Sequence, residues 1–332
     1  MNHHRCLLTK LINFKSTSLL VVFFLLAITK TVSHAQKTDD FRDTIPSRSQ
    51  MIDFATLSST VYENDSNIEK RWPTGYEAVG FVTTDDGTQV WVLKKNGIPT
   101  IAFRGTDETK DWYTNLDLDR EKPKMQGAEG KTHSGFQESL FKKQGKNLQM
   151  FLTRLKKTKG GPYTTIKNGI VADQLEKMVL REGMSSELHV TGHSLGGALS
   201  MVMASYMAAK YPRVKVTMVT FGAPRVGSKD WRTWANSKKN LRMFRYSYKT
   251  DLVARIPPPG TYQHAGHTIW IWEGSSTPSE NGSFIYYLHD GCDAAGDRKD
   301  FCKKNELVSK PKSWNCKLLL YSNSNLLFTC KS

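Results

Sequence analysis

The sequence has 332 residues, 39% hydrophobic and 11% aromatic, with 47 basic and 31 acidic residues and a formal net charge of +16. The length suits one large α/β domain whose core needs no metal. The charge favours anionic surfaces such as lipid headgroups or acidic wall polymers, although general solubility explains it equally well. Nucleic acid is not expected as a partner, because the basic residues are scattered and no binding motif occurs.

The first 35 residues are expected to form a secretory signal peptide. They contain four basic residues, no acidic residue, and an apolar run over residues 19–28 that is too short to span a bilayer comfortably. Residues 33–35, Ser-His-Ala, supply small residues at the positions that cleavage before Gln36 requires. Cleavage removes the four basic residues, lowers the net charge from +16 to +12, and leaves residues 36–332 as a secreted chain. An uncleaved anchor is the alternative, because the basic region ahead of the apolar run is long.

Four cysteines remain after this cleavage, and all lie in the C-terminal segment 291–332. They are Cys292, Cys302, Cys316 and Cys330. An even number in an exported chain predicts two disulfides, with three possible connectivities. No C-x-x-C spacing occurs, so a zinc site is not expected. Asn64 and Asn281 each begin an N-x-S sequence and are candidate glycosylation sites.

The sequence of the N-terminal part of the mature chain indicates a helix followed by three strands. Apolar residues at nearly helical spacing predict the helix over residues 50–64. Two runs of β-branched and aromatic residues, 78–83 and 89–94, flank Asp-Asp-Gly and predict a hairpin. The apolar run 98–103 predicts a further strand that ends before Arg-Gly-Thr.

The polar segment after this strand, over residues 106–131, is expected to contain a lid over an active-site mouth. Its first half carries Trp112, Tyr113 and Leu116. Trp112 and Leu116 are four residues apart, so a short helix can present both on one face. An ordinary surface loop is the alternative.

Helices and strands alternate through the following part of the chain. Apolar residues spaced by three and four predict a helix over residues 134–155, and a second helix is expected over 167–182. Three further strands are expected to end near residues 193, 221 and 248, with helices between them. This alternation predicts an α/β fold with a mainly parallel central sheet flanked by helices, and ligands at the carboxyl ends of its strands.

Residues 188–199 carry the pattern around which the remaining chain is organised. A short apolar run leads into Gly-His-Ser-Leu-Gly-Gly, followed by an Ala- and Met-rich stretch suited to a helix. This predicts a strand, a tight turn and a helix, with Ser194 in a strained conformation and its hydroxyl exposed at the strand's carboxyl end. Only glycine fits at positions 192 and 196, and the Leu195 N–H is directed at a developing oxyanion. A chance glycine-rich turn is the alternative.

A serine nucleophile needs a base and an orienting acid, which follow later in the chain in this fold, acid first. Asp251 follows the last of the three strands and precedes a run of prolines that fix its loop. His264, His267 and His289 are the candidate bases. Chain order and its place after an aromatic segment favour His289, whereas His264 is suited to a structural bond with a backbone carbonyl. His193, beside the serine, is expected to pack or bond within the turn.

Several sequence blocks occur in an order that resembles the class 3, or fungal-type, lipases of the α/β-hydrolase superfamily. They include Ala-Phe-Arg-Gly-Thr at 102–106, His-Ser-Gly-Phe at 133–136, the serine turn, and Thr-Phe-Gly-Ala-Pro-Arg-Val-Gly at 220–227. Together they lie between residues 78 and 290. The resemblance implies one α/β-hydrolase domain over residues 36–332, with a lid after the strand that ends near Arg104.

The same resemblance implies roles for individual residues. Ser194 is the nucleophile, Asp251 the orienting acid and His289 the base, and the backbone N–H groups of Thr106 and Leu195 form the oxyanion hole. The sequence also departs from the family pattern at four positions. Asn115 stands where an acid usually fixes the first oxyanion residue, Leu288 where Asp commonly precedes the base, Ala254 for a proline, and His267 for an acidic residue.

These features predict a secreted serine carboxylic-ester hydrolase, first of all a triacylglycerol lipase, that acts through an acyl-enzyme without a metal or cofactor. A lipid or other ester is the expected partner, at a lipid–water interface, for a monomeric enzyme. Phospholipids and galactolipids are related substrates, and the polar lid favours an esterase for soluble or wall-bound feruloyl-type esters as an alternative. An alternative of another class is a non-catalytic lipid-binding protein that kept the fold.

Overall fold

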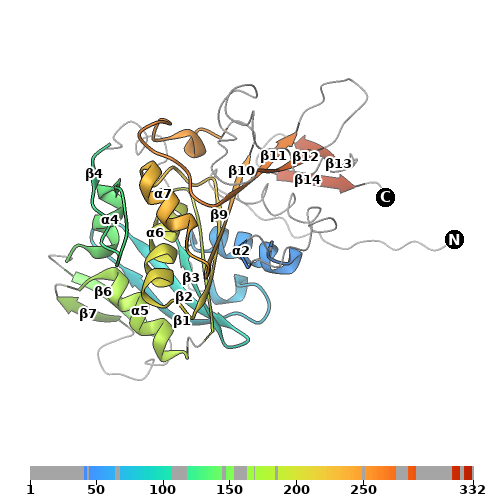
Figure 1. The fold of residues 1–332 in the computed structure, drawn as a ribbon. Helices are drawn as coiled ribbons and strands as arrows, with labels where there is room; N and C mark the ends of the chain where they lie inside the picture. Colours follow the sequence, from blue (N-terminus) through green and yellow to red (C-terminus); the bar gives the residue numbers. More distant parts are fainter. Residues whose placement is uncertain are drawn as a thin grey trace.

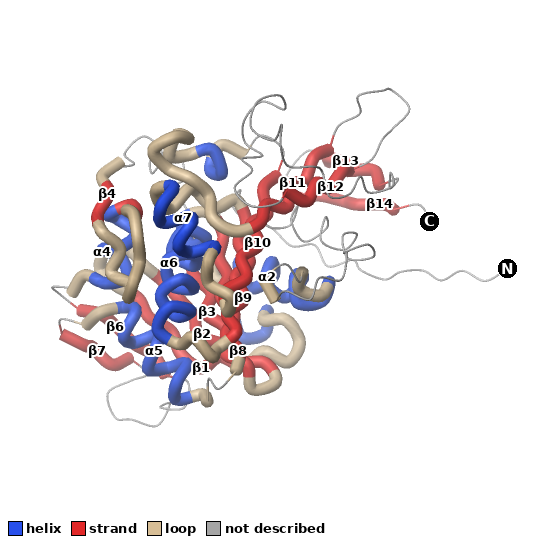
Figure 2. The backbone as a smooth tube through the Cα atoms, viewed as in Figure 1, coloured by secondary structure: helices blue, strands red, loops and turns tan. Residues whose placement is uncertain are grey.

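A ten-stranded sheet with helices on both faces forms the body of the protein, seen here in a computed structural model (Figures 1 and 2). The strand order is β12-β11-β10-β9-β8-β3-β2-β1-β6-β7. The structure describes residues 41–42, 45–63, 68–106, 118–143, 147–152, 163–167, 169–183, 186–248, 251–273, 283–288, 316–321 and 325–330.

The large sheet comprises β1 (Glu77–Thr83), β2 (Gln89–Lys95), β3 (Ile98–Phe103), β6 (Asn147–Leu152), β7 (Tyr163–Lys167), β8 (Glu187–His193), β9 (Lys215–Phe221), β10 (Leu241–Tyr248), β11 (His267–Glu273) and β12 (Ser283–Leu288). Two small pairs are β4 (Arg120–Glu121) with β5 (Thr132–His133), and β13 (Cys316–Tyr321) with β14 (Asn325–Cys330). The helices are α2 (Arg48–Thr60), α4 (Ser134–Phe141), α5 (Val171–Arg181), α6 (Leu195–Lys210) and α7 (Lys229–Asn236), with short 3-10 helices at Ile68–Arg71 and Val253–Arg255. The backbone register of the last pair sets Cys316 opposite Cys330, and the disulfides expected from the sequence stay a prediction.

The five central strands β3, β8, β9, β10 and β11 run parallel, and the strands outside them pair antiparallel. β8 and β9 are buried along almost their whole length, as expected for strands covered on both faces. Parallel strands end at the same edge, so the turns after β8, β9 and β10 meet there. The predicted α/β fold with a mainly parallel centre is therefore confirmed.

Helices α4, α5, α6 and α7 cover one face of the sheet, and α2 covers the other (Figure 1). The first group shares one hydrophobic core with the central strands, and α6 is buried on nearly every side. α2 starts at a capping box in which Ser47 Oγ accepts from the N–H of Gln50 and Gln50 Oε1 accepts from the N–H of Ser47. Its residues Met51 and Phe54 pack onto strands β9 and β10. The strand that carries the serine turn, β8, therefore lies between α2 and α6.

The prediction of a helix over residues 134–155 is wrong beyond Phe141, where α4 ends. Residues 147–152 form β6 instead, and β7, which the sequence pattern did not predict, pairs with it. Leu148, Met150 and Leu152 alternate along this run, so its apolar residues fit a strand as well as a helix. Residues Gly80–Thr83 of β1 pair antiparallel with it, and this tertiary pairing decides between the two periods.

Several expectations fall outside the described residues. They are the signal peptide over 1–35, the lid residues Trp112, Tyr113 and Leu116, the glycosylation sites Asn64 and Asn281, and the cysteines Cys292 and Cys302. Among the helices that the structure describes, none is both long and apolar enough to cross a membrane.

A polar cluster around Glu176 joins α5 to α6. The carboxylate accepts from Lys210 Nζ at 2.7 Å, from the Tyr206 hydroxyl at 2.9 Å and from the Tyr211 hydroxyl. Burial raises the pKa of Glu176, but the hydrogen bonds from Lys210 and the two tyrosines together outweigh burial and hold this pKa below its ordinary value. The ionised carboxylate thus stabilises the contact between the two helices.

We expect Glu176→Gln to destabilise the protein at neutral pH and to do so less in acid. A carboxyl whose pKa is lower in the folded chain contributes stability above its unfolded pKa, and this contribution is lost as the pH falls through the folded value. The difference in Tm from the wild type should therefore shrink below about pH 4.5, measured by circular dichroism from neutral to acid pH. Glu138→Gln, which removes the exposed pair with Lys142, is the control and should change Tm little. A difference that stays constant with pH would contradict the assignment.

Candidate active site

Ser194 lies in the tight turn between β8 and α6, at the carboxyl end of β8. Its φ of 56° and ψ of −129° place a non-glycine residue in a backbone region that side chains rarely occupy. The neighbouring helix approaches closely enough to hold this conformation. A Cβ on Gly192 would lie 2.4 Å from the Gly196 carbonyl oxygen, and a Cβ on Gly196 would lie 2.5 Å from the Phe103 carbonyl oxygen. The turn therefore needs glycine at both flanking positions.

The backbone of Ser194 is tied to the neighbouring strand, whereas its hydroxyl is not used. The Ser194 N–H donates to the Phe221 carbonyl at 3.0 Å, and the Ser194 carbonyl accepts from the N–H of Gly197 at 2.9 Å. The Oγ atom is buried, not exposed as the turn predicts, and it has no hydrogen-bond partner among the described residues. A fixed, buried hydroxyl of this kind is suited to a base supplied from elsewhere in the chain.

Asp251 comes after β10 and reaches the segment that holds Ser194. Its N–H donates to the Tyr248 carbonyl at 2.9 Å, and its Oδ1 accepts from the Val253 N–H at 2.9 Å. Oδ2 is buried, has no hydrogen-bond partner in the described part of the chain, and would lie 2.6 Å from a Cβ on Gly222. Gly222 also has a φ of 55° and directly follows the residue that accepts from Ser194. A larger residue there would displace the carboxylate.

The charge of Asp251 is costly in this environment. Burial raises the pKa of its carboxyl to about 6, and the Val253 hydrogen bond and the Arg255 charge only partly oppose this rise. A buried carboxylate with one unused oxygen is suited to orient an imidazole and to stabilise its charged form.

Arg225 fixes the loop that follows Asp251. Its buried guanidinium donates to the Pro257 carbonyl at 2.6 Å and to the Arg255 carbonyl, and its N–H donates to the Ile256 carbonyl at 2.8 Å. In the sequence, the prolines alone predict that this loop is rigid, and they do not point to Arg225. Its position in the block 220–227 is the only sequence signal for it.

His264 and His267, the alternative bases, have structural contacts. His264 Nε2 donates to the Ala254 carbonyl at 2.8 Å, and burial together with the charges of Arg245 and Arg225 holds the pKa of this ring well below its ordinary value. This is the structural role given for His264 as an alternative. His267 begins β11, and its ring stacks on Phe244. The favoured base, His289, follows β12 and lies outside the described residues.

Thr106 and Leu195, the expected oxyanion residues, belong to segments in direct contact. Leu195 is the first residue of α6, where backbone N–H groups are free of helical partners. A Cβ on Gly196 would lie 2.9 Å from the Arg104 carbonyl oxygen, so the turn that carries Thr106 begins against the start of α6. Asn115, the residue aligned with the family's anchoring acid, lies outside the described residues.

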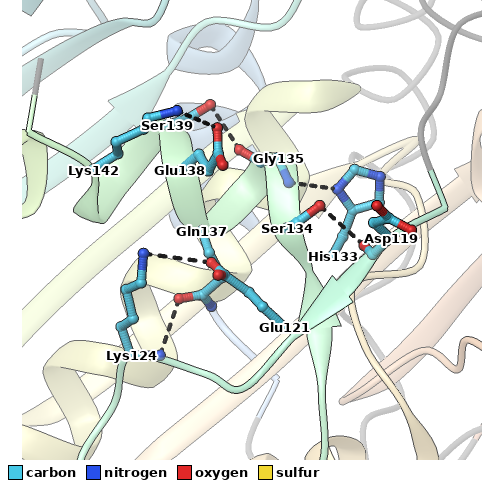
Figure 3. Close-up of polar contacts among 10 residues, drawn as sticks. All are labelled: Asp119, Glu121, Lys124, His133, Ser134, Gly135, Gln137, Glu138, Ser139 and Lys142. Atoms are coloured by element: carbon cyan, nitrogen blue, oxygen red, sulfur yellow. Dashed lines mark hydrogen bonds and ion pairs between the residues drawn. The ribbon is translucent and has the colours of Figure 1, made fainter. Parts of the chain in front are cut away.

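The chain that follows the expected lid is firmly anchored (Figure 3). Ser134 donates through its N–H and its hydroxyl to the Asp119 carbonyl, at 2.9 and 3.1 Å. The Tyr262 hydroxyl donates to the Leu118 carbonyl at 2.9 Å, and the Lys124 N–H donates to Gln137 Oε1 at 3.1 Å. The segment beginning at Leu118 is therefore fixed to α4 and to the loop before β11.

A basic groove of about 490 Å³ lies at the other end of the sheet. Its lining includes Arg213, Lys215, Lys238 and Lys239 and no acidic residue. Lys215 begins β9, so the groove opens at the amino ends of the parallel strands, and none of the candidate site residues lines it. In the described part of the chain, no group of three or more His, Cys, Asp or Glu residues is arranged to hold a metal ion.

A parallel sheet with a strained serine turn after a central strand, and a buried acid two strands further along, defines an α/β-hydrolase. Residues 100–261 match the family model described as "Lipase (class 3)". The matched residues make up just under half of the chain, and over this part the chain is similar to the class 3 lipase family.

Two curated relatives are also lipolytic enzymes by name. The triacylglycerol lipase OBL1 of Arabidopsis thaliana is 28% identical over 51% of this chain and 37% of its own length. The phospholipase A1-II 1 of Oryza sativa subsp. indica is 28% identical over 62% of this chain and 50% of its own length. The chain thus spans half or less of the length of these relatives. The solved lipase II from Rhizopus niveus shares the fold, with a TM-score of 0.51, 21% identity, and coverage of 71% of this chain and 83% of that one.

We expect Asp251→Asn to stabilise the fold. Because the pKa of Asp251 is raised in the folded chain, ionisation of this carboxyl costs stability as the pH rises from its ordinary pKa of 3.8 to about 6. A neutral amide avoids this cost. The Tm of the variant should therefore exceed that of the wild type by an amount that grows over this pH interval and stays constant above it.

Thermal unfolding across this interval measures the difference, with Asp119→Asn at an exposed position as the control. A difference in Tm that becomes smaller as the pH rises would show that the folded chain favours the charged carboxylate.

Proposed function

We propose that the protein is a secreted serine carboxylic-ester hydrolase that acts first of all on triacylglycerols. The observation that carries this proposal is the strained Ser194, whose buried Oγ has no partner among the described residues and lies at the catalytic edge of an α/β-hydrolase sheet. The adjoining buried carboxylate of Asp251 and the match of residues 100–261 to the class 3 lipase family model support it.

In the proposed reaction, His289 takes the proton of Ser194 as Oγ attacks the acyl carbonyl, and Asp251 orients the imidazole. The N–H groups of Thr106 and Leu195 stabilise the oxyanion. The protonated imidazole then donates its proton to the departing alcohol, which leaves an acyl-enzyme. A water deprotonated by the same base attacks this ester, releases the fatty acid and restores the serine. The chemistry uses no metal or cofactor.

Two exposed leucines favour a lipid surface over a dissolved substrate. Leu252 directly follows Asp251 and is 58% exposed, and Leu118, at the end of the expected lid, is 52% exposed. Apolar side chains exposed beside an active site are suited to contact lipid. Phospholipid is the second candidate substrate, because a phospholipase A1 matches the chain as well as a triacylglycerol lipase does. The proposed enzyme acts as a monomer at the lipid–water interface.

Covalent labelling tests the nucleophile. An alkyl fluorophosphonate, followed by peptide mass mapping, is expected to modify Ser194 in the wild type and to leave the Ser194→Ala variant unmodified. Asp251→Asn should react much more slowly, because the imidazole then lacks its orienting carboxylate. A wild type that folds but takes no label would favour the non-catalytic lipid-binding alternative.

Replacing the exposed leucines tests the substrate class. Leu118→Asp and Leu252→Asp should reduce hydrolysis of an emulsified long-chain triacylglycerol about tenfold, and change hydrolysis of a dissolved short-chain ester much less, because each variant places a charge against the lipid. Leu180→Asp is the matched control, since Leu180 is 44% exposed on α5, which ends before the amino end of β8. Equal losses on both substrates, or no preference of the wild type for the emulsion, would favour an esterase.

A further inference from the structure

We propose that Tyr62 is a positioning residue that holds the two halves of the oxyanion hole in register. The inference deepens the proposed hydrolase function and rests on it. Tyr62 follows α2, on the face of the sheet opposite α6, and so approaches the serine turn from the side that the proposed mechanism does not use. Nothing in the sequence pattern of the turn itself points to this residue.

The Tyr62 hydroxyl contacts the residue that precedes the nucleophile. It forms a hydrogen bond of 2.9 Å with His193 Nδ1 and lies 3.5 Å from the His193 carbonyl oxygen. The tyrosine ring is buried in a hydrophobic cluster with Trp72, Leu93 and Ala102. The position of the hydroxyl is therefore set by core packing, and the hydrogen bond transmits that position to the serine turn.

The same hydroxyl lies against the turn that carries the other expected oxyanion donor. A Cβ on Gly105 would lie 2.1 Å from the Tyr62 hydroxyl oxygen and 2.6 Å from the His193 carbonyl oxygen. Gly105 directly precedes Thr106, and the Arg104 guanidinium lies over the Tyr62 ring at 5.8 Å. One oxygen atom therefore touches both the segment that leads to Thr106 and the segment that leads to Leu195.

His193 is suited to act as a neutral link in this contact. Its ring is buried, and burial lowers its pKa to about 4, so it carries no charge at neutral pH. A neutral imidazole accepts at one nitrogen and donates at the other, so the tyrosine hydroxyl can bond to Nδ1 in either tautomer. The hydrogen bond between Tyr62 and His193 therefore involves no change of charge near neutral pH. It should not alter the pH dependence of the reaction.

The contact matters because an oxyanion hole works only when both donors are at hydrogen-bonding distance from the same oxygen. Loss of one donor in such a site typically costs 10²–10³-fold in kcat. Without the Tyr62 hydroxyl, Gly105 and His193 are free to approach or separate by a fraction of an ångström. This displacement weakens the hole without removing a donor, so its cost should be smaller.

Tyr62→Phe keeps the ring and removes only the hydroxyl. We expect kcat on a dissolved short-chain ester to fall about tenfold per phosphonate-titrated active site, with KM nearly unchanged, because the loss falls on the transition state. The pH profile of kcat/KM should keep its shape. Inhibition by an alkyl boronic acid, whose tetrahedral adduct places an oxygen in the hole, should weaken by a similar factor.

Ser58→Ala is the matched control. It removes another buried hydroxyl between α2 and β8, the Ser58 Oγ contact of 2.8 Å with Thr191 Oγ1, away from the serine turn. Both variants should lower Tm, and only Tyr62→Phe should lower kcat. A Tyr62→Phe enzyme with unchanged kcat per active site, or equal losses in both variants, would overturn the positioning role. A shifted pH profile would also overturn it, because it would make Tyr62 part of a proton path.

A double-mutant cycle with Gly105→Ala gives a second test. The added methyl collides first with the Tyr62 hydroxyl, so the effects of the two substitutions on kcat should not be additive, and the alanine should be better tolerated in the Tyr62→Phe background. Additive effects would show that the hydroxyl does not hold Gly105. If the wild type neither reacts with the phosphonate nor hydrolyses esters, the proposed function fails. An active wild type with an indifferent Tyr62 overturns only this inference.

Discussion

The geometry of the candidate site, at the carboxyl ends of the parallel strands, depends on the close approach of α6 to the end of β3. The first turn of the helix lies against backbone atoms of Phe103 and Arg104, at a distance that admits no side chain on Gly196. This approach brings the start of α6 beside the turn that carries Thr106, and it forces Ser194 into a conformation that costs about 1–3 kcal/mol. The cost is offset by the burial of nearly the whole of α6 in the main core.

The helix on the opposite face has a role beyond covering the sheet. α2 and the residues just after it form two hydroxyl contacts with β8, from Ser58 to Thr191 and from Tyr62 to His193. Thr191 in turn donates to the Val219 carbonyl of β9. The strand that leads to Ser194 therefore has contacts on both sides, by apolar packing against α6 and by hydrogen bonds toward α2.

Strands β3, β8, β9 and β10 follow from the sequence, because each is a short run rich in apolar and β-branched residues. Strand β11 was not predicted. The serine turn and the acid after β10 are equally readable, since local spacing determines both. The strands at the β6–β7 edge of the sheet cannot be predicted in this way. The run 147–152 fits two periods, and only the pairing with β1 decides between them. The contacts of Arg225 and Tyr62 cannot be predicted from local sequence for a related reason. Their partners lie 32 and 131 residues away in the chain, respectively.

The candidate site contains several buried polar atoms that lack partners within the described residues. Within the described residues, Ser194 Oγ, Asp251 Oδ2 and His193 Nε2 are buried atoms without hydrogen-bond partners. Such an atom typically costs about 1–3 kcal/mol, which a structural site would avoid. Ser194 contacts Phe221 and Asp251 lies against Gly222, the next residue, so a single imidazole is able to satisfy both. A ligand that fills the oxyanion position would satisfy the helix N–H groups as well. Binding should therefore stabilise the folded chain, because it supplies partners for buried polar groups.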